Sequence, residues 1–533
     1  MSDTAAQSHP TIDTTHPTLA ALYAQIDTST SPERRDALHT LARMLLRRLG
    51  EEELRSRSVE HLLGTVRSAF SLIDARGNHP ASVRVFVPSL ETDGYEVGGT
   101  IIETNTDDSP FLVDSLTEEL AARNLGVRLL LHPIIGTARA EDGHIERVMS
   151  ARDAAHRESL THFELDRRLN EQARADLEVR IRSILHDVRL VVRDFEPMQE
   201  RARHMGELAR QAAVAYSPQE VGETVDFVEW LLNLNFVFLG YREYRMADGP
   251  EGRTIQAVSG SGLGILADVS TSAFADATPL HALEPDVRRR IEVGELLVIT
   301  KTKAYSTVHR RARMDYVGVR IVSPEGEIVG EARLIGLFTS KAYMEPAAKT
   351  PLLHHKLEQI IAAEDLIPGS HDHKQVIELF ESFPRDELFQ ASADELRGLV
   401  VGLLQLEKHG GIRVLVRIDL FGRQVSVVVA LPRERFSAAL RKRLQEMVRQ
   451  RFNGTTVDYH LSLGETESAK IFFTVHVDGT TQIPEVPYEE LEEEVERLAR
   501  TWDDDLLEQL IVHLGPERGP LLAAEYGPRF PDY

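Results

Sequence analysis

The chain has 533 residues, of which 42% are hydrophobic and 27% charged, a composition typical of a globular protein with several domains. Asp and Glu (84) outnumber Lys and Arg (61), and the net charge is −23. Because the basic residues are interspersed with acidic ones, this charge argues against a nucleic-acid or membrane-surface partner. The absence of cysteine excludes disulfides, thiolate catalysis and cysteine-based zinc sites.

The N-terminal residues 1–18 are polar and punctuated by proline, which is typical of a disordered tail. They contain neither the basic nor the apolar region of a signal peptide. No apolar run elsewhere approaches the roughly 20 residues that span a bilayer. These features predict a cytoplasmic protein.

Residues 19–79 have helical apolar spacing, and residues 80–200 follow as an α+β unit. Its stretch "SVRVFVPS" alternates as a strand, with Val83 and Val85 on one face. The later stretch "NTDDSPFLVDSLTEELAARNLGV" predicts a helix with Ser109 as N-cap and Pro110 in its first position. We expect a sandwich with helices on one face of the sheet.

Residues 201–366 predict a helix followed by an antiparallel sheet, the pattern of a PAS-like or GAF-like sensor fold. Two long strands of this sheet flank the turn Pro324-Glu325-Gly326. The stretch "LIPGSHDH" predicts a linker over residues 367–390.

Residues 391–484 predict a helix, a strand pair around Phe421-Gly422-Arg423, a second helix and two more strands. This order is a βαββαβ unit with its first strand moved to the end, so we expect a second ferredoxin-like layer. Residues 485–533 predict one long amphipathic helix and a truncated tail. The apolar stripe of the helix needs a partner, either its own domain or a segment absent from the chain; its members are Leu491, Val495, Leu498, Trp502, Leu506 and Leu510.

No motif assigns a catalytic, cofactor-binding or metal-binding residue. In "AVSGSGLGIL" the third glycine comes one residue too early for the dinucleotide fingerprint, which favours a plain loop. His354 and His355 are adjacent on a predicted helix, so their side chains diverge. His371 and His373 could offer two imidazoles from a loop, fewer than the ligands a metal needs.

A basic cluster permits two interpretations. It comprises Lys301, Lys303, Arg310, Arg311 and Arg313. Such a cluster can bind an anionic effector or pair with an acidic neighbour, but a solvated strand face is favoured.

Five segments resemble one family, the large NAD-specific glutamate dehydrogenases of bacteria. They are "TNTDDSPFLVDSLTEEL", "FVFLGYREY", "STVHRRARMDYVGV" with "GLFTSKAY", "ESFPRDELFQ" and "VRIDLFGRQVSVVVALPRERF". The resemblance spans roughly residues 80 to 480. It implies an α+β fold in which ACT-like domains over 80–200 and 391–484 flank the PAS/GAF-like unit, with helical connectors.

The resemblance also implies a role at the first strand–helix junction. ACT modules join these elements through D-x-P-G-L, whose free N–H groups can hold an amino-acid carboxylate. Asp108, Ser109 and Pro110 match that pattern, but Phe111 stands where glycine is usual. The candidate effector-binding residues are therefore Asp108, Ser109, Phe111 and Asp114, with Phe111 filling the space that a ligand would use.

In that family the present region is a regulatory N-terminal segment, and the catalytic domain with its NAD site lies downstream. We therefore expect no cofactor in this chain, NAD in the full-length enzyme, and no activity from these residues alone. The expected partners are the catalytic part of the enzyme, further copies in a homo-oligomer and an amino-acid effector. The alternative is a free-standing amino-acid-binding sensor or adaptor.

Overall fold

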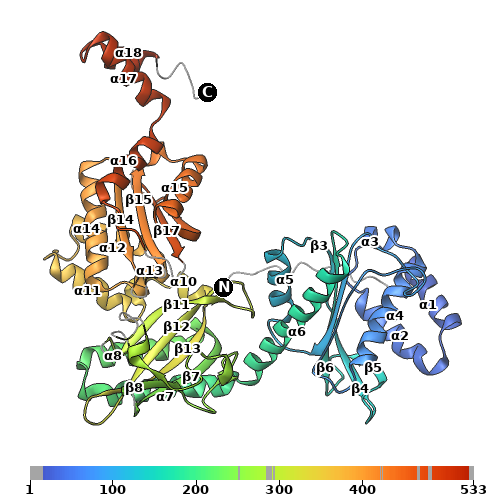
Figure 1. The fold of residues 1–533 in the computed structure, drawn as a ribbon. Coiled ribbons are helices and arrows are strands. Elements are labelled where there is room, and N and C mark those ends of the chain that lie inside the picture. The colour runs from blue at the N-terminus through green and yellow to red at the C-terminus, as the bar shows by residue number, and fades with distance from the viewer. Residues whose placement is uncertain are drawn as a thin grey trace.

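The computed structural model describes residues 16–249, 252–283, 288, 291, 294–419, 422, 424–464, 468–477 and 483–526. These residues form three antiparallel sheets, and three successive units of the chain are built around them (Figure 1). The predicted tail 1–18 lies almost wholly outside the described residues, since the first helix begins at Pro17. No helix in the described part of the chain is long and apolar enough to cross a membrane.

The first unit opens with four helices and continues as a sheet with two further helices. The helices are α1 (Pro17–Ser29), α2 (Pro32–Leu45), α3 (Glu51–Ser56), α4 (Val59–Arg76), α5 (Leu112–Ala122) and α6 (Glu171–Arg193). The strands are β1 (Ala81–Phe86), β2 (Ile101–Asp107), β3 (Val127–Leu131), β4 (Ile134–Arg139), β5 (Ile145–Ser150) and β6 (Arg157–Leu165). The sheet order is β1-β2-β6-β4-β5, with β3 also pairing β6.

Helices cover both faces of this first sheet, whereas the sequence analysis expected them on one face. Val83 and Val85 point into the core with α5 and α6, as their alternation predicts. The opposite face packs on α1, α2 and α4 through residues such as Leu160. Every β6 residue after Arg157 is buried, because the sheet lies between two helical layers (Figure 1).

The middle unit is a sheet with helices packed on it. Its helices are α7 (Phe195–Gln211), α8 (Pro218–Trp230), α10 (Ser340–Met344) and α11 (Leu353–Ala363). Its strands are β7 (Phe236–Gly249), β8 (Gly252–Ala257), β9 (Leu263–Gly264), β10 (Thr278–Pro279), β11 (Leu297–Tyr305), β12 (Arg313–Val322) and β13 (Ile328–Phe338). The order is β10-β8-β7-β13-β12-β11, and β9 pairs β7. The predicted hairpin at Pro324-Glu325-Gly326 is confirmed, since Val322 pairs with Ile328 and Gly326 has φ of 90°.

The third unit begins in the segment that was expected to be a linker. Residues 367–390 instead contain α12 (His371–Ser382) and α13 (Arg385–Gln390). Ser370 caps α12, and Val376, Leu379 and Phe380 are buried at helical spacing. The Pro368-Gly369 turn therefore marks the start of packed helices, not of a connector.

The remaining elements of this unit form the third sheet and its helices. They are α14 (Ala393–His409), β14 (Arg413–Ile418), β15 (Gln424–Pro432), α15 (Ala438–Arg451), β16 (Gly454–Ser462), β17 (Ser468–Val477) and α16 (Tyr488–Ala499). The sheet order is β14-β15-β17-β16. Phe421 and Arg423 of the predicted turn lie outside the described residues. Short 3₁₀ turns join elements along the chain at Ala212–Val214, Val269–Thr271, Leu280–Ala282, Ala347–Lys349 and Arg433–Arg435, with a π-helical turn at Leu231–Asn235.

The predicted long C-terminal helix is two helices, and a third lies in the predicted tail. Helix α16 ends with Arg500 as its C-cap. Thr501 and Asp504 then form a capping box that starts α17 (Trp502–Leu514). α18 (Arg518–Tyr526) follows. Leu491 and Val495 pack on the third sheet, whereas α17 has no buried residue. The apolar stripe is thus half covered by its own unit and half left outside it (Figure 1).

Candidate functional site: the junctions between the units

At the junction between β2 and α5, the helix begins later in the sequence than predicted. The N-cap of α5 is Phe111 and not Ser109, so Pro110 precedes the helix instead of opening it. Phe111 has φ of 71° and ψ of −4°, the left-handed conformation that favours glycine. The turn through Phe111 completes the reversal, and the helix begins at Leu112.

The backbone at Phe111 has a conformation that glycine adopts without strain, while its side chain fills the space beside the turn. The phenyl ring is half-buried and packs against the main hydrophobic core. It also lies 5.2 Å from the His309 imidazole, measured between ring centroids. His309 comes from the loop between β11 and β12, so this loop of the middle unit covers the junction.

Hydrogen bonds hold the loop on α5. The backbone N–H of His309 donates to Ser115 Oγ at 2.9 Å, and the His309 ring lies 3.6 Å from the Asp114 carboxylate. The backbone N–H of Arg311 donates to the Glu118 carboxylate at 3.1 Å. The remaining cavity has a volume of about 10 Å³, room for roughly one water molecule.

The four predicted effector residues therefore divide into two pairs. Phe111 and Asp114 face the middle unit. Asp108 is exposed and its backbone N–H donates to Arg157 O at 3.0 Å, and Ser109 is half-buried beside it. Sequence reasoning missed His309 and Ser115, which are 194 residues apart and carry no local motif.

A second junction joins the middle unit to the third through α13. Lys301 Nζ on β11 lies 2.5 Å from Asp315 and 3.1 Å from Asp386 on α13. Burial would lower the pKa of Lys301, but the two carboxylates raise it above its ordinary value. Tyr343 Oη donates to Asp386 at 3.0 Å. Lys301, predicted to be part of a solvated basic face, instead pairs with two carboxylates and has a side chain that is 14% exposed.

The next residue of α13 faces the other way. Glu387 accepts two hydrogen bonds from the Arg417 guanidinium on β14, at 2.5 and 2.9 Å, and one from Ser426 Oγ on β15 at 2.5 Å. The Glu387 and Arg417 side chains are at most 10% exposed. Adjacent carboxylates of one short helix thus bind the sheets of two units. Both lie in "PRDELF", a stretch used in the resemblance but given no role in the sequence analysis.

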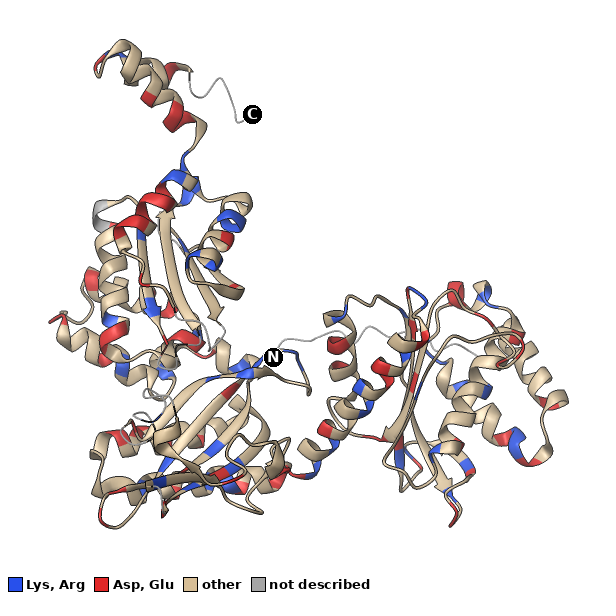
Figure 2. Cartoon of the chain, viewed as in Figure 1, with Lys and Arg blue, Asp and Glu red and all other residues tan. Residues whose placement is uncertain are grey.

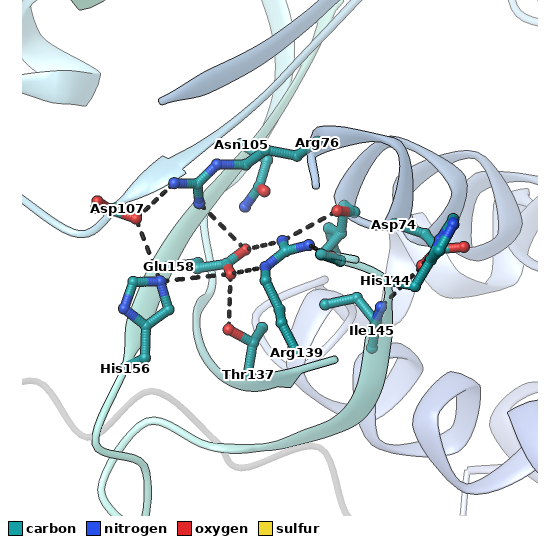
Figure 3. Close-up of polar contacts among 12 residues, drawn as sticks. Asp74, Arg76, Asn105, Asp107, Thr137, Arg139, His144, Ile145, His156 and Glu158 are labelled. Atoms are coloured by element: carbon teal, nitrogen blue, oxygen red, sulfur yellow. Dashed lines mark hydrogen bonds and ion pairs between the residues drawn. The ribbon is translucent and has the colours of Figure 1, made fainter. Parts of the chain in front are cut away.

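A buried ionic cluster ties the helical layer of the first unit to its sheet (Figure 3). Glu158 on β6 is fully buried and accepts from Arg139 at 2.8 and 2.9 Å and from Thr137 at 2.6 Å. Arg76 of α4 lies 3.4 Å from Glu158, and Arg139 also donates to Ile73 O of α4 at 3.0 Å. Burial would raise the pKa of Glu158, but Arg139 and Thr137 hold it below its usual range. Every contact stays within the unit, so the cluster is structural.

The other candidates from the sequence form no site. Gly264 belongs to β9, and its N–H donates to Asp194 at 2.8 Å, so the glycine-rich loop is a packed part of the sheet. His371 opens α12 instead of lying in a loop. His354 and His355 pair with Glu358 at 3.1 and 3.3 Å. Within the described ranges, no group of three or more His, Asp or Glu side chains is arranged to hold a metal.

Charge on the ribbon shows no segregated basic region among the described residues (Figure 2). Acidic and basic positions are interspersed along the ribbon of all three units, as their order in the sequence predicts. Acidic residues gather in the first turns of α16 and α17, namely Glu489, Glu490 and Asp503 to Asp505.

Comparison with known proteins gives these units a family. The sequence matches three family descriptions: glutamate dehydrogenase ACT1 domain over residues 41–181, helical motif 1 over 350–409, and ACT2 domain over 413–503. The helical motif covers α11, α12, α13 and α14, the segment that contains the expected linker.

Whole-chain relatives agree. The chain is 30% identical over 518 residues to an NAD-specific glutamate dehydrogenase of Halomonas elongata, covering 96% of this chain and 32% of the relative. It is 30% identical over 484 residues to one of Pseudomonas aeruginosa, covering 90% and 30%. It is 23% identical over 446 residues to one of Mycobacterium tuberculosis, covering 81% and 26%.

The chain thus spans about a third of the length of the curated relatives it matches. The three domain matches follow one another along the chain and belong to one family. The segments quoted from the sequence point to the same family. The chain belongs to the large NAD-specific glutamate dehydrogenase family and contains its ACT1, helical motif 1 and ACT2 domains.

Proposed function

We propose that this chain is the regulatory and assembly segment of a large NAD-dependent glutamate dehydrogenase. The reaction of the whole enzyme would be L-glutamate, NAD and water to 2-oxoglutarate, ammonia and NADH. The observation that carries the proposal is the match of 96% of the chain to a relative named NAD-specific glutamate dehydrogenase. Hydride transfer would then need residues outside this segment.

The sheet architecture supports this division of labour. Every strand pair recorded between described residues is antiparallel. A dinucleotide-binding fold is built on a mostly parallel sheet with crossover helices, so the described units offer no such scaffold for NAD. We propose that NAD serves the full-length enzyme and binds elsewhere than in these units.

Strand order supports the finer fold assignment. The order β14-β15-β17-β16 is what a ferredoxin-like βαββαβ sheet becomes when its first strand moves to the end of the chain. In the middle unit the first and last long strands, β7 and β13, pair at the centre of the sheet, as in PAS-like and GAF-like folds. We propose that ACT-like units flank a PAS/GAF-like unit.

We further propose that the junctions serve to couple the units. Loop 306–311 covers α5 of the first unit, and α13 binds the middle and third sheets through Asp386 and Glu387. In this arrangement Phe111 and Asp114 contact the loop of the middle unit, whereas Asp108 is exposed and Ser109 half-buried beside it, so an amino-acid effector would reach the space at Phe111 only if the loop moves. These contacts would also fix the shape of each copy of the chain in a homo-oligomer.

Titration calorimetry of the purified chain tests the proposal, with a panel of amino acids, with NAD, and with the mass in solution measured in parallel. The proposal expects no NAD binding and a defined oligomer. Saturable NAD binding would overturn it. Saturable amino-acid binding by a monomer would favour the free-standing sensor instead.

A further inference from the structure

A cavity of about 730 Å³ lies between the middle unit and the third unit. Its wall on one side is the end of β11 and the loop into β12, and its floor on the other side is the face of the third sheet. Helix α13 closes one end with Asp386 and Glu387. This volume falls in the range of small-molecule sites, and interdomain positions are common for them.

The floor is polar across three strands. Ser426 of β15 pairs with Thr474 of β17, which pairs with Asp458 of β16, so the three side chains lie abreast on one face of the sheet. The same three residues line the cavity. An apolar core would place Val or Ile in such a row, as the opposite face of this sheet does with Val427 and Phe473. A polar row is therefore suited to a polar ligand.

The wall carries two arginines that form no ion pair among the described residues, although Arg313 acts on the Asp458 carboxylate of the floor and helps to lower its pKa. Arg310 donates to Phe338 O at 3.0 Å, and Arg313 donates to Lys303 O at 3.4 Å. Neither guanidinium has a described carboxylate within 4 Å, whereas Lys301 and Arg385 beside them do. The Arg313 Nε is buried and has no hydrogen-bond partner among the described residues.

Aromatic rings complete the wall around these cations. The Arg313 guanidinium carbon lies 5.2 Å from the Tyr305 ring centroid, and that of Arg310 lies 5.8 Å from the Tyr343 ring centroid. The rings hold the guanidiniums in place without neutralising them. Burial lowers the pKa of His460 on the floor, which favours its neutral form, so the positive charge of the cavity comes from the wall and not from this imidazole.

We propose that this cavity binds a small organic anion, with its carboxylate or phosphate group at Arg310 and Arg313 and its polar body on the Ser426–Thr474 floor. Two guanidiniums with unused donors match the geometry of either anion. The inference concerns binding alone and does not rest on the proposed function, so the failure of one leaves the other standing.

The test is titration calorimetry of the full chain with succinate in one arm and adenosine monophosphate in the other. Saturable binding of succinate assigns a carboxylate ligand, and saturable binding of the nucleotide assigns a phosphate ligand. The affinity of the Arg313→Gln variant for the probe that binds should be at least about tenfold lower, the loss expected for a charge-assisted hydrogen bond. Arg201→Gln is the matched control, because Arg201 also stacks on a tyrosine, 5.8 Å from the Tyr241 centroid, but lies outside the cavity.

A second pair of variants keeps the test independent of the arginines' structural role. Thr474→Glu places a negative charge on the floor and should abolish binding, whereas Thr474→Gln has nearly the same size without charge and should retain most of it. If neither probe saturates with the wild type, the proposal is wrong. It is equally wrong if Arg313→Gln and Thr474→Glu, with unchanged circular dichroism, bind as the wild type does.

Discussion

Phe111 allows a measurement of what its left-handed backbone costs the fold. At φ of 71° the Cβ of a residue other than glycine crowds the following carbonyl oxygen, at a cost of roughly 1–2 kcal/mol. The wild type offsets this cost by half-burying the phenyl ring against His309 and the core. Full burial of a phenylalanine contributes roughly 1.5–3 kcal/mol, so half-burial contributes about 1 kcal/mol.

Two substitutions separate these contributions. Phe111→Ala keeps the backbone cost and loses the ring, so the free energy of unfolding should fall by about 1 kcal/mol. Phe111→Gly loses the ring and the backbone cost together, so it should be more stable than the alanine variant by about 1 kcal/mol. Glycine is normally the less stable of the two, and the reversed sign identifies the strain.

The assay is urea unfolding followed by the fluorescence of Trp230. The chain has two tryptophans, and Trp502→Phe leaves Trp230, which is buried in the core that Phe111 also contacts. Val179 on α6 is an exposed helical control, where glycine should be less stable than alanine by about 1 kcal/mol. If the alanine variant of Phe111 equals or exceeds the glycine variant, as at Val179, the strain argument is refuted.

Three further predictions concern the buried charges and the C-terminal helices. Glu158→Gln should lower the free energy of unfolding by about 3–5 kcal/mol at pH 7, because Arg139 loses its carboxylate partner and the buried Arg76 keeps only Asp107. The folded protein holds the pKa of Glu158 below its ordinary value of 4.5, so the ionised carboxylate stabilises the fold above that pH. This stabilisation is lost as the pH falls through the lowered pKa, and the denaturation profiles of wild type and variant should converge at low pH. Glu387→Ala should lower the free energy of unfolding by about 3–5 kcal/mol. Combining Glu387→Leu with Arg417→Met should lower it by less than the sum of these two changes made singly. Additivity in this double-mutant cycle would contradict the pairing. Truncation after Arg500 should shift the melting temperature by less than about 2 °C, because α17 has no buried residue; a larger drop in calorimetry would show that these helices support the fold.

Local patterns in the sequence were sufficient for the β12–β13 hairpin and for the two faces of β1. The strand alternation of Val83 and Val85 reports directly on which side chains enter the core. The break at Arg500 was also readable, because Thr501 and Asp504 have the spacing of a capping box. The continuous apolar stripe across the break concealed it.

The joints could not be predicted from the sequence, because they are long-range. Ser115 and His309 are 194 residues apart, and Lys301 on β11 of the middle unit pairs with Asp386 on α13 of the third unit. The linker expectation is wrong for a local reason: Pro368-Gly369 is only a turn, and Val376, Leu379 and Phe380 follow it at the spacing of a buried helix face. Buried pairs of this kind follow from the packing of whole units, which no local pattern specifies.

The most direct test of the central claim is the absorbance of NADH formed by the purified chain with L-glutamate and NAD. The preparation should come from a host lacking its own glutamate dehydrogenases. The account predicts no turnover above the same preparation made without the expression plasmid. Turnover that co-purifies with the chain and requires both L-glutamate and NAD would contradict it, since the described antiparallel units would then have to carry the dehydrogenase chemistry.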